Sequence, residues 1–560
     1  MSTQDAVGLT TRQGGYSSVM RLMPWIAAEW HRLLLAIFLG ASALACGVGL
    51  MATSAWLISR AAQQPPILEL EIAIVAVRAF GIGRGVLRYA ERLVSHDSAF
   101  RALSRLRVSV YDRLAIVAPA GVPAYRRGDL LERMVRDVDA IQDLPLRVIV
   151  PYASGIVTCV GSVVLAYVIL PAAGLVLLIS LLLSALLVPF MTGRAAAGAE
   201  RESAHARGHL NAEALGLVDG LGELLLGGAS AQWLARIEAA DGQVSRLRLR
   251  SARTSALAAS VGVLLSGGAV IAMLLVAIPA VRAGQLDGVN LAVLVLLPLA
   301  TYEAVSIMPA AALSLGRVRG SAERVVAVLD APDLVPAPLQ PVAAPTGVPK
   351  LVMRDVVCSW PGGAPMRLAG ELRVEPGQRV GIVGASGVGK STLLAALAGL
   401  LPYAGSLCLD AVEIRQMDGA QVRKIVGWCP QLPHIFDSSI VENVRLARPS
   451  STDSDVRSVL NKVGLGQWID SLPAGMDTHV GDRGGQISAG QRQRIGVARV
   501  LLAGHPVVLL DEPTEHLDEV NAGVVARELL RALDGRTVVW VAHRPHGLVE
   551  LDQIVHVNRA

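Results

Sequence analysis

Residues 384–391 read Gly-Ala-Ser-Gly-Val-Gly-Lys-Ser, the residue types and spacing of a phosphate-binding loop. Glycines allow backbone N–H groups to turn inward around phosphate oxygens, and the N-terminus of the following helix attracts the same anion. Lys390 would bring positive charge to the β- and γ-phosphates, and the Ser391 hydroxyl would bind Mg²⁺. An apolar strand over 380–383 and an apolar helix after the loop complete the required context. The residues expected to bind nucleotide here are Gly384, Ala385, Ser386, Gly387, Val388, Gly389, Lys390, Ser391 and Thr392.

A second chemical signal is the acidic pair Asp511-Glu512, which ends the apolar run 507–510. Two adjacent acids at the end of a buried strand are costly unless a metal ion or a reaction uses them. We expect Asp511 to hold Mg²⁺ through water and Glu512 to polarise the water that attacks the γ-phosphate. Together with the loop, the pair predicts binding and hydrolysis of ATP.

The composition indicates that a membrane domain accompanies this nucleotide site. Of 560 residues, 52% are hydrophobic and 17% are charged, against roughly 25% charged in ordinary globular proteins. The five cysteines are scattered, which excludes a disulfide scaffold and a thiolate metal cluster. Six apolar segments each approach the ~20 residues that cross a bilayer. They are 33–58, 67–89, 148–170, 175–190, 256–280 and 291–312.

The fold class expected is therefore multidomain, with an all-α transmembrane domain of six helices and an α/β domain that carries the phosphate loop. In the second domain, strands over 378–383, 507–510 and 537–542 alternate with helices such as 391–400. The expected boundaries are a polar N-terminal tail (1–20), the transmembrane domain with cytoplasmic extensions (21–330), a Pro- and Ala-rich linker (331–349) and the ATP-binding domain (350–560).

The distribution of arginine predicts the orientation in the membrane. The connections 89–145 and 194–253 are rich in arginine, whereas the other connections are short and nearly uncharged. By the positive-inside rule, both long connections, both termini and the ATP-binding domain face the cytoplasm. We find no polybasic block that would indicate nucleic acid as a partner.

Further motifs in 340–560 follow one another in the order found in ATP-binding cassette (ABC) domains, and this region resembles that family. The matching positions are Trp360, Gln431, Ser488-Ala489-Gly490-Gln491, Leu517-Asp518 and His543. The resemblance implies that Trp360 stacks on adenine and that Gln431 senses Mg²⁺. It also implies that His543 contacts the γ-phosphate and joins Glu512 and Gln431 as the catalytic set. The Mg²⁺ contacts implied are Ser391, Gln431 and Asp511.

In this family, the signature segment of one chain completes the ATP site of a second chain, so the resemblance implies a dimer. Ser488, Gly490 and Gln491 would then bind nucleotide held by the partner. Ala489 departs from the usual glycine and is expected to remove some backbone freedom. The segment 515–518, Glu-His-Leu-Asp, also departs from the commoner Ser-Ala-Leu-Asp.

The first half resembles the transmembrane domain of exporter-type (type IV) ABC proteins. Residues 128–138 resemble the pattern after the first coupling helix, 220–224 the second coupling region, and 320–324 the end of the sixth span. Six spans with one cassette are typical of a half-transporter, which works as a pair of chains in a lipid bilayer.

A stripe of ionisable residues marks the second span and its extension. Arg84, Arg88, Arg92 and His96 are spaced by four, so they lie along one helix face over roughly 18 Å. Ionisable residues at membrane depth commonly have a functional role and face an interior cavity. The alternative is that Arg88, Arg92 and His96 anchor the helix at the cytoplasmic surface. Glu303 in the sixth span is a possible arginine partner.

The segment 88–97 resembles one subfamily closely, the CydC half of the heterodimeric CydDC exporters that cytochrome bd assembly requires. Residues 511–515 and the Tyr302-Glu303 pair point the same way. This resemblance implies a CydD-like partner in the bacterial plasma membrane, and haem or a reduced thiol (cysteine, glutathione) as substrate or ligand. The implied haem contacts are His96, Arg92 and Arg88, because imidazole ligates haem iron and guanidinium pairs with propionates.

Two alternatives remain open from the sequence. One is a homodimeric multidrug or lipid exporter, against which the basic stripe argues because apolar cargo does not need it. The other is a non-transporting, haem-responsive ATPase that acts in cytochrome assembly and would carry the same motifs.

Overall fold

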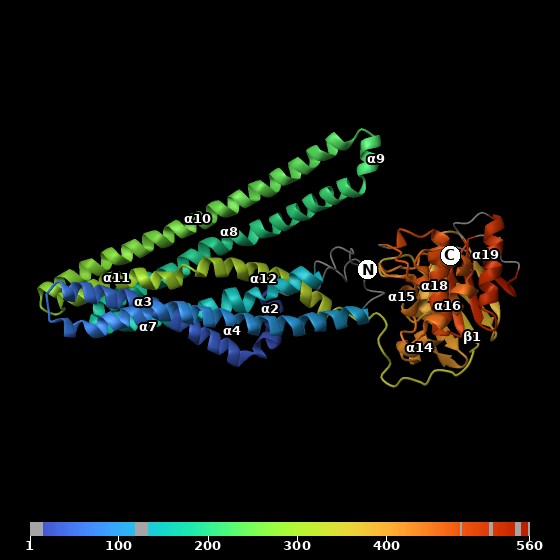
Figure 1. The fold of residues 1–560 in the computed structure, drawn as a ribbon, viewed down its shortest axis with the longest axis horizontal. Coiled ribbons are helices and arrows are strands. Elements are labelled where there is room, and N and C mark those ends of the chain that lie inside the picture. The colour runs from blue at the N-terminus through green and yellow to red at the C-terminus, as the bar shows by residue number, and fades with distance from the viewer. Residues whose placement is uncertain (1–14, 118–132, 482–483, 515–518, 544–549, 558–560) are drawn as a thin grey trace. The chain divides into compact units, whose positions relative to one another are not determined.

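The computed structural model describes residues 15–117, 133–481, 484–514, 519–543 and 550–557 (Figure 1). The chain divides into two compact units, with the main boundary between Ala331 and Pro332. The first unit is helical, and the second combines helices with two sheets.

The helical unit is built from long helices joined by short connections. The long helices are α3 (Trp30–Ala61), α4 (Glu71–Val117), α7 (Val150–Ile169), α8 (Pro171–Asp219), α10 (Ser230–Arg282), α11 (Gly288–Val305) and α12 (Met308–Leu329). The shorter ones are α2 (Gly15–Ala27), η1 (Ile67–Glu69), η3 (Arg133–Asp137), α6 (Val138–Ile141), η4 (Leu144–Ile149) and α9 (Leu221–Leu226). Helices α8 and α10 run side by side, and α9 lies in the connection between them (Figure 1).

Five described helical stretches are long and apolar enough to cross a membrane, and they match five of the six expected spans. The expected second span lies at the start of α4, which forms a helix in the expected place. By length and composition alone α4 does not qualify, because Arg78, Arg84 and Arg88 interrupt its apolar sequence. The sixth apolar stretch is divided at 306–307, where α11 ends and α12 begins.

The turn between the third and fourth spans is tighter than expected. Leu170 alone is extended between α7 and α8, and Pro171 already begins α8, where its missing N–H is not needed. The close approach requires a glycine at position 174, because a Cβ there would lie 2.6 Å from Cβ of Tyr167.

The second unit contains an antiparallel sheet and a parallel sheet. The antiparallel sheet has the order β2-β1-β4-β5, and the parallel sheet has the order β6-β7-β8-β3-β9. The strands are β1 (Leu351–Cys358), β2 (Met366–Val374), β3 (Arg379–Val383), β4 (Tyr403–Leu409), β5 (Val412–Glu413), β6 (Val426–Cys429), β7 (Val507–Asp511), β8 (Thr537–Ala542) and β9 (Gln553–His556). The helices are α13 (Lys390–Leu397), η5 (Ile414–Gln416), α14 (Gly419–Ile425), α15 (Ile440–Arg445), α16 (Asp453–Lys462), α17 (Gly466–Asp470), η6 (Gly475–Asp477), α18 (Ala489–Ala503) and α19 (Glu519–Ala532).

The expected strands and the helix after the phosphate loop are confirmed as β3, β7, β8 and α13. The central strands β7 and β8 are buried along their whole length. They read as continuous apolar runs because helices cover both faces of a parallel sheet.

A buried carboxylate ties the segment before the third span to α12. Asp137 is only 3% exposed and accepts hydrogen bonds from Arg324 Nε at 2.6 Å and from Ser321 Oγ at 3.0 Å. Removing one member of such a pair leaves the other polar group without its compensating charge.

We therefore expect Asp137→Ala to destabilise the helical unit by about 2 kcal/mol, below the 3–5 kcal/mol of fully buried pairs because Arg324 is half-exposed. The measurement is the thermal-unfolding midpoint in detergent. The control is Asp330→Ala, which removes the exposed pair with Arg21, whose side chains are 62% (Arg21) and 42% (Asp330) accessible and which should contribute under about 1 kcal/mol. Equal shifts in the two variants would contradict the assignment.

Candidate functional site

Four parallel strands deliver the predicted catalytic residues to one edge of the sheet. The phosphate loop follows β3, Gln431 follows β6, the Asp511-Glu512 pair ends β7, and His543 follows β8. Because these strands are parallel neighbours, their carboxyl ends lie together, and this edge is where α/β sheets bind ligands.

The phosphate loop has a backbone that only glycine adopts easily. Gly387 and Gly389 have φ values of +76° and +97°. A Cβ at Gly389 would lie 2.5 Å from Cβ of Met366, and a Cβ at Gly384 would lie 2.5 Å from the Val557 carbonyl oxygen. The loop thus needs these glycines for its own packing as well as for phosphate.

Lys390 is held over this loop with its side chain only 4% exposed. Its Nζ donates to the carbonyl oxygens of Gly384 at 2.8 Å and Ala385 at 3.0 Å. It also lies 3.4 Å from Oε1 of Glu512. These contacts place the ammonium group inside the loop, where a phosphate would need it.

Ser391 and Asp511 form a pair of oxygen donors that suits Mg²⁺. The Ser391 hydroxyl donates to Oδ1 of Asp511 at 3.0 Å, and Asp511 is buried. Hydroxyl and carboxylate oxygens are the ligand types that Mg²⁺ prefers. These two residues would hold the ion.

Glu512 is the meeting point of the site. Gln431 Nε2 donates to its Oε2 at 3.1 Å, and His543 Nε2 lies 3.2 Å from its Oε1, the same oxygen that faces Lys390. Its backbone has a φ of +48°, uncommon outside glycine, and its N–H donates to the Val541 carbonyl at 3.0 Å. A sheet hydrogen bond and three side chains therefore orient this carboxylate.

The residue before Pro430-Gln431 adds no charge to the site. Burial raises the pKa of the Cys429 thiol to about 12, so it stays protonated at physiological pH. Cys429 therefore acts as a packing residue beside Gln431.

The signature residues form a helix cap. Ser488 Oγ accepts from the Gln491 N–H at 3.2 Å, and Gln491 Oε1 accepts from the Ser488 N–H at 2.8 Å, a capping box at the start of α18. Among the described residues, no hydrogen bond joins Ser488, Gly490 or Gln491 to the phosphate loop. Ala489 is the first residue of α18, a right-handed position that alanine adopts without strain.

Trp360 is half-buried after β1 and packs against the sheet core. Its carbonyl accepts from the Gly363 N–H at 2.9 Å, which closes a turn. Stacking of this ring on adenine remains a prediction. Two segments that resemble family motifs lie outside the described residues. They are 515–518, which departs from Ser-Ala-Leu-Asp, and 128–132, the start of the pattern after the first coupling helix.

The basic stripe of α4 divides between an ion pair and a cavity. Arg84 donates to Glu303 Oε1 on α11 at 2.7 Å, the partner expected from the sequence. Arg88, Arg92 and His96 line a cavity of about 550 Å³, called here the charged cavity. Its other ionisable lining residues are Glu91, Asp143 and Arg147.

Sequence reasoning missed Asp143 and Arg147. They lie beside and within η4, a π-helical stretch whose wider turn alters which side chains share a face. Only their charge, next to the start of an apolar span, could have drawn attention to them.

A nucleotide-binding edge on a parallel sheet, in a chain that also carries a bundle of apolar helices, defines a membrane protein that couples ATP hydrolysis to transport. The chain belongs to the ABC transporter family: residues 370–515 match the model of the ABC transporter, and residues 32–302 that of the ABC transporter transmembrane region. It is a multi-pass exporter half-transporter of this family.

The relatives agree over nearly the whole chain. The glutathione/L-cysteine transport system ATP-binding/permease protein CydC of Escherichia coli is 32% identical over 548 residues, which cover 95% of this chain and 94% of the relative. CydD of Bacillus subtilis, described in the same words, is 31% identical and covers 96% and 94%. A solved bacterial Atm1-family ABC exporter with ATP bound has a TM-score of 0.80 over 97% of this chain, at 18% identity, and supports the fold alone.

We expect Glu512→Gln to reduce ATP turnover at least about a hundredfold, because a carboxylate that polarises water is lost while the binding loop is intact. ATP should still bind and remain trapped, as measured by retained radiolabelled nucleotide. Glu375→Gln, which changes an exposed carboxylate of the same unit, should leave turnover unchanged. Full turnover in Glu512→Gln would assign hydrolysis to the second chain's site.

Proposed function

We propose that this chain is the CydC-like half of a heterodimeric ABC exporter in the bacterial plasma membrane, which handles haem and/or reduced thiols (cysteine, glutathione) for cytochrome bd assembly. The observation that carries the proposal is the charged cavity on α4. Arginines at membrane depth are costly, and a cavity that gathers them suits an anionic ligand.

His96 is set up to ligate a metal. Its Nδ1 lies 2.8 Å from the Arg92 carbonyl oxygen, which can only accept a hydrogen bond. Nδ1 therefore carries the proton, and the lone pair of Nε2 is left for a metal such as haem iron. The ring of Phe100 lies edge-to-face with the His96 imidazole, with 6.1 Å between the ring centroids, and adds an apolar side chain next to it.

The charge balance of the cavity favours carboxylates. Arg88, Arg92 and Arg147 face two acids, Glu91 and Asp143, and Asp143 already pairs with Arg147 at 3.1 Å. The remaining guanidinium groups can bind carboxylates in bidentate fashion. Haem propionates and the carboxylates of cysteine or glutathione are both of this chemical class.

The relatives support the thiol part of the proposal. Two of them are glutathione/L-cysteine transport proteins, one the CydC half and one the CydD half. Their identities to this chain are nearly equal, so the assignment to the CydC-like half rests on the segment 88–97.

The ATP site supports a working unit of two chains. Ser488 and Gln491 cap their own helix, and together with Gly490 they would approach nucleotide on a CydD-like partner. We place the ATP-binding unit and both termini in the cytoplasm, because the connections rich in arginine flank the spans on that side.

Within this chain, each residue of the site has one task in the ATP cycle. Lys390 and the loop N–H groups would bind the β- and γ-phosphates, and His543 would contact the γ-phosphate. Mg²⁺ held by Ser391, Asp511 and Gln431 would neutralise phosphate charge. Glu512 would take up the proton of the attacking water. Trp360 would hold the adenine.

The charged cavity argues against a homodimeric multidrug or lipid exporter, because apolar cargo gains nothing from arginines that cost energy to bury. The native mass and subunit composition of the purified complex distinguish a heterodimer from a homodimer. One copy each of two different half-transporters supports the proposal.

A non-transporting, haem-responsive ATPase would share both sites. ATP-dependent accumulation of haem or glutathione in inside-out vesicles, abolished by Glu512→Gln, identifies a transporter. ATP hydrolysis without accumulation of either solute would favour the non-transporting, haem-responsive ATPase.

We expect haem added to the complex to give a Soret band that is lost or shifted in His96→Ala, because the imidazole that would ligate the iron is removed. In Arg92→Ala the band should persist with about tenfold weaker binding, because a charge-assisted contact is lost. Absorbance titration measures both.

Two controls match these variants. His209→Ala removes an exposed imidazole on α8, and Arg101→Ala removes an exposed arginine of α4 outside the cavity lining. Both should bind haem normally. If His96→Ala and Arg92→Ala also bind it normally, the stripe is an interfacial anchor and thiols remain as the cargo.

A further inference from the structure

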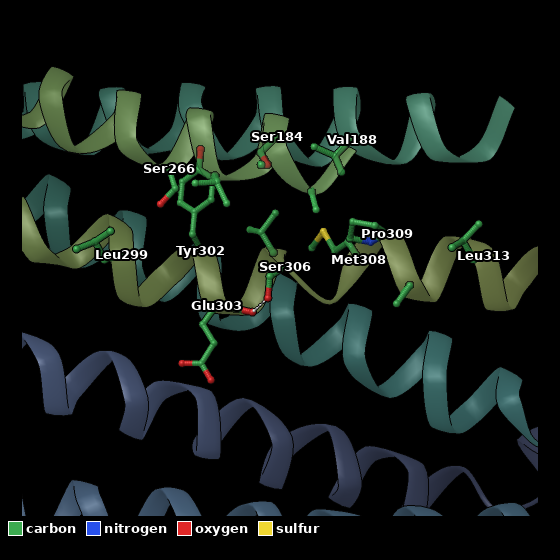
Figure 2. Close-up of a pocket in the computed structure, with 15 residues that line it drawn as sticks. Ser184, Val188, Ser266, Leu299, Tyr302, Glu303, Ser306, Met308, Pro309 and Leu313 are labelled. Carbon is green, nitrogen blue, oxygen red and sulfur yellow. Dashed lines mark hydrogen bonds between the residues drawn. The ribbon is translucent and has the colours of Figure 1, made fainter. Parts of the chain in front are cut away.

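A second cavity of about 510 Å³ lies in the helical unit between α8, α10, α11 and α12 (Figure 2). We call it the apolar cavity. It sits at the break in the sixth apolar stretch, where Ser306, Met308 and Pro309 line it. Its volume falls within the range of small-molecule sites, and it shares no lining residue with the charged cavity.

The break is stable because its polar groups are satisfied. Ser306 Oγ donates to the Glu303 carbonyl at 2.8 Å, and the Tyr152 hydroxyl donates to the Met308 carbonyl at 3.2 Å. Pro309 in the first turn of α12 needs no N–H acceptor. A discontinuity whose polar groups are paired is a built feature of the span, and such breaks occur where backbone lines a cavity.

The walls of the apolar cavity are mostly aliphatic, and their polar groups are hydroxyls. Among its described lining residues, none is Arg, Lys or His. Glu303 lies at the edge, but its carboxylate is paired with Arg84 and points away from Tyr302 and the helices above it (Figure 2). A charged ligand would find no counter-charge there, and burying an unpaired charge is costly.

One hydroxyl points to a ligand directly. Ser184 on α8 lines the cavity, is only 1% exposed, and makes no hydrogen bond with the described residues. Ser266 on α10 adds a second hydroxyl, and Tyr302 points into the space between these helices (Figure 2). Buried polar groups are nearly always hydrogen-bonded, so Ser184 lacks an acceptor that a ligand could supply.

We propose that the apolar cavity binds an uncharged, mainly apolar small molecule that carries a hydrogen-bond acceptor for Ser184. This site is separate from the charged cavity and takes the opposite class of ligand. It therefore stands whether or not haem or thiols bind at Arg88, Arg92 and His96.

Photolabelling of the full-length chain in its native assembly, in lipid nanodiscs, tests the proposal. The probe is benzophenone with a short alkyne tag, since its two rings are apolar and its ketone is an acceptor. We expect saturable labelling of peptides from 259–266 and 302–313, suppressed by excess untagged benzophenone. Tagged benzophenone-4-carboxylate should label these peptides at least about tenfold less.

Two glycines of α10 provide matched variants. A Cβ at Gly262 or at Gly267 meets no atom within 4 Å, but only Gly262 lines the cavity. Gly262→Trp should fill the cavity and abolish the saturable labelling, whereas Gly267→Trp should leave it unchanged. Ser184→Ala, which removes only the hydroxyl oxygen, should raise the half-saturating probe concentration about fivefold.

Three outcomes would overturn the proposal. Non-saturable labelling spread over lipid-facing helices would mean that acyl chains fill the cavity. Equal labelling of Gly262→Trp and the unsubstituted chain would place the probe elsewhere. Stronger labelling by the carboxylate would show that the site prefers anions.

Discussion

The arrangement of the ATP-binding unit depends on the carboxylate of Glu512. Side chains that follow three other strands of the parallel sheet lie close to it. Lys390 lies 3.4 Å away, Gln431 3.1 Å and His543 3.2 Å. A carboxylate and an ammonium group buried this deeply are tolerated only with close partners. The order of the parallel sheet, the strained backbone at Glu512 and the glycines of the loop all serve to bring these partners together.

An unpaired charge is also costly in the helical unit, where lipid surrounds the spans. A charged side chain at membrane depth must pair or face a cavity, and the stripe on α4 does both. Arg84 pairs with Glu303, while Arg88 and Arg92 line the charged cavity beside His96. The charged cavity and the apolar cavity are thereby separate: Ser306 and Met308 line the apolar cavity, and Ile307 lines the charged cavity.

Much of this arrangement could be predicted because it is local in sequence. The loop 384–391 predicts the strand before it and the helix after it, and the apolar run before Asp511 predicts a strand. The length of the apolar segments predicts five of the spans. The Arg84–Glu303 pair was anticipated because membrane charges have few partners to choose from. The antiparallel sheet was missed, since its strands β1, β2 and β4 alternate buried and exposed residues irregularly and pair around a bulge at Asp355.

The sequence by itself determined the class of chemistry, the elements that carry it and the family, because these depend on residue type and short spacing. Only the tertiary structure decided which groups meet. Asp137 bonds Arg324 across 187 positions, Asp143 and Arg147 line one cavity with His96, and Ser184 is left without an acceptor beside another. Such contacts depend on how helices pack and where a helix is broken, and neither periodicity nor composition encodes those distances.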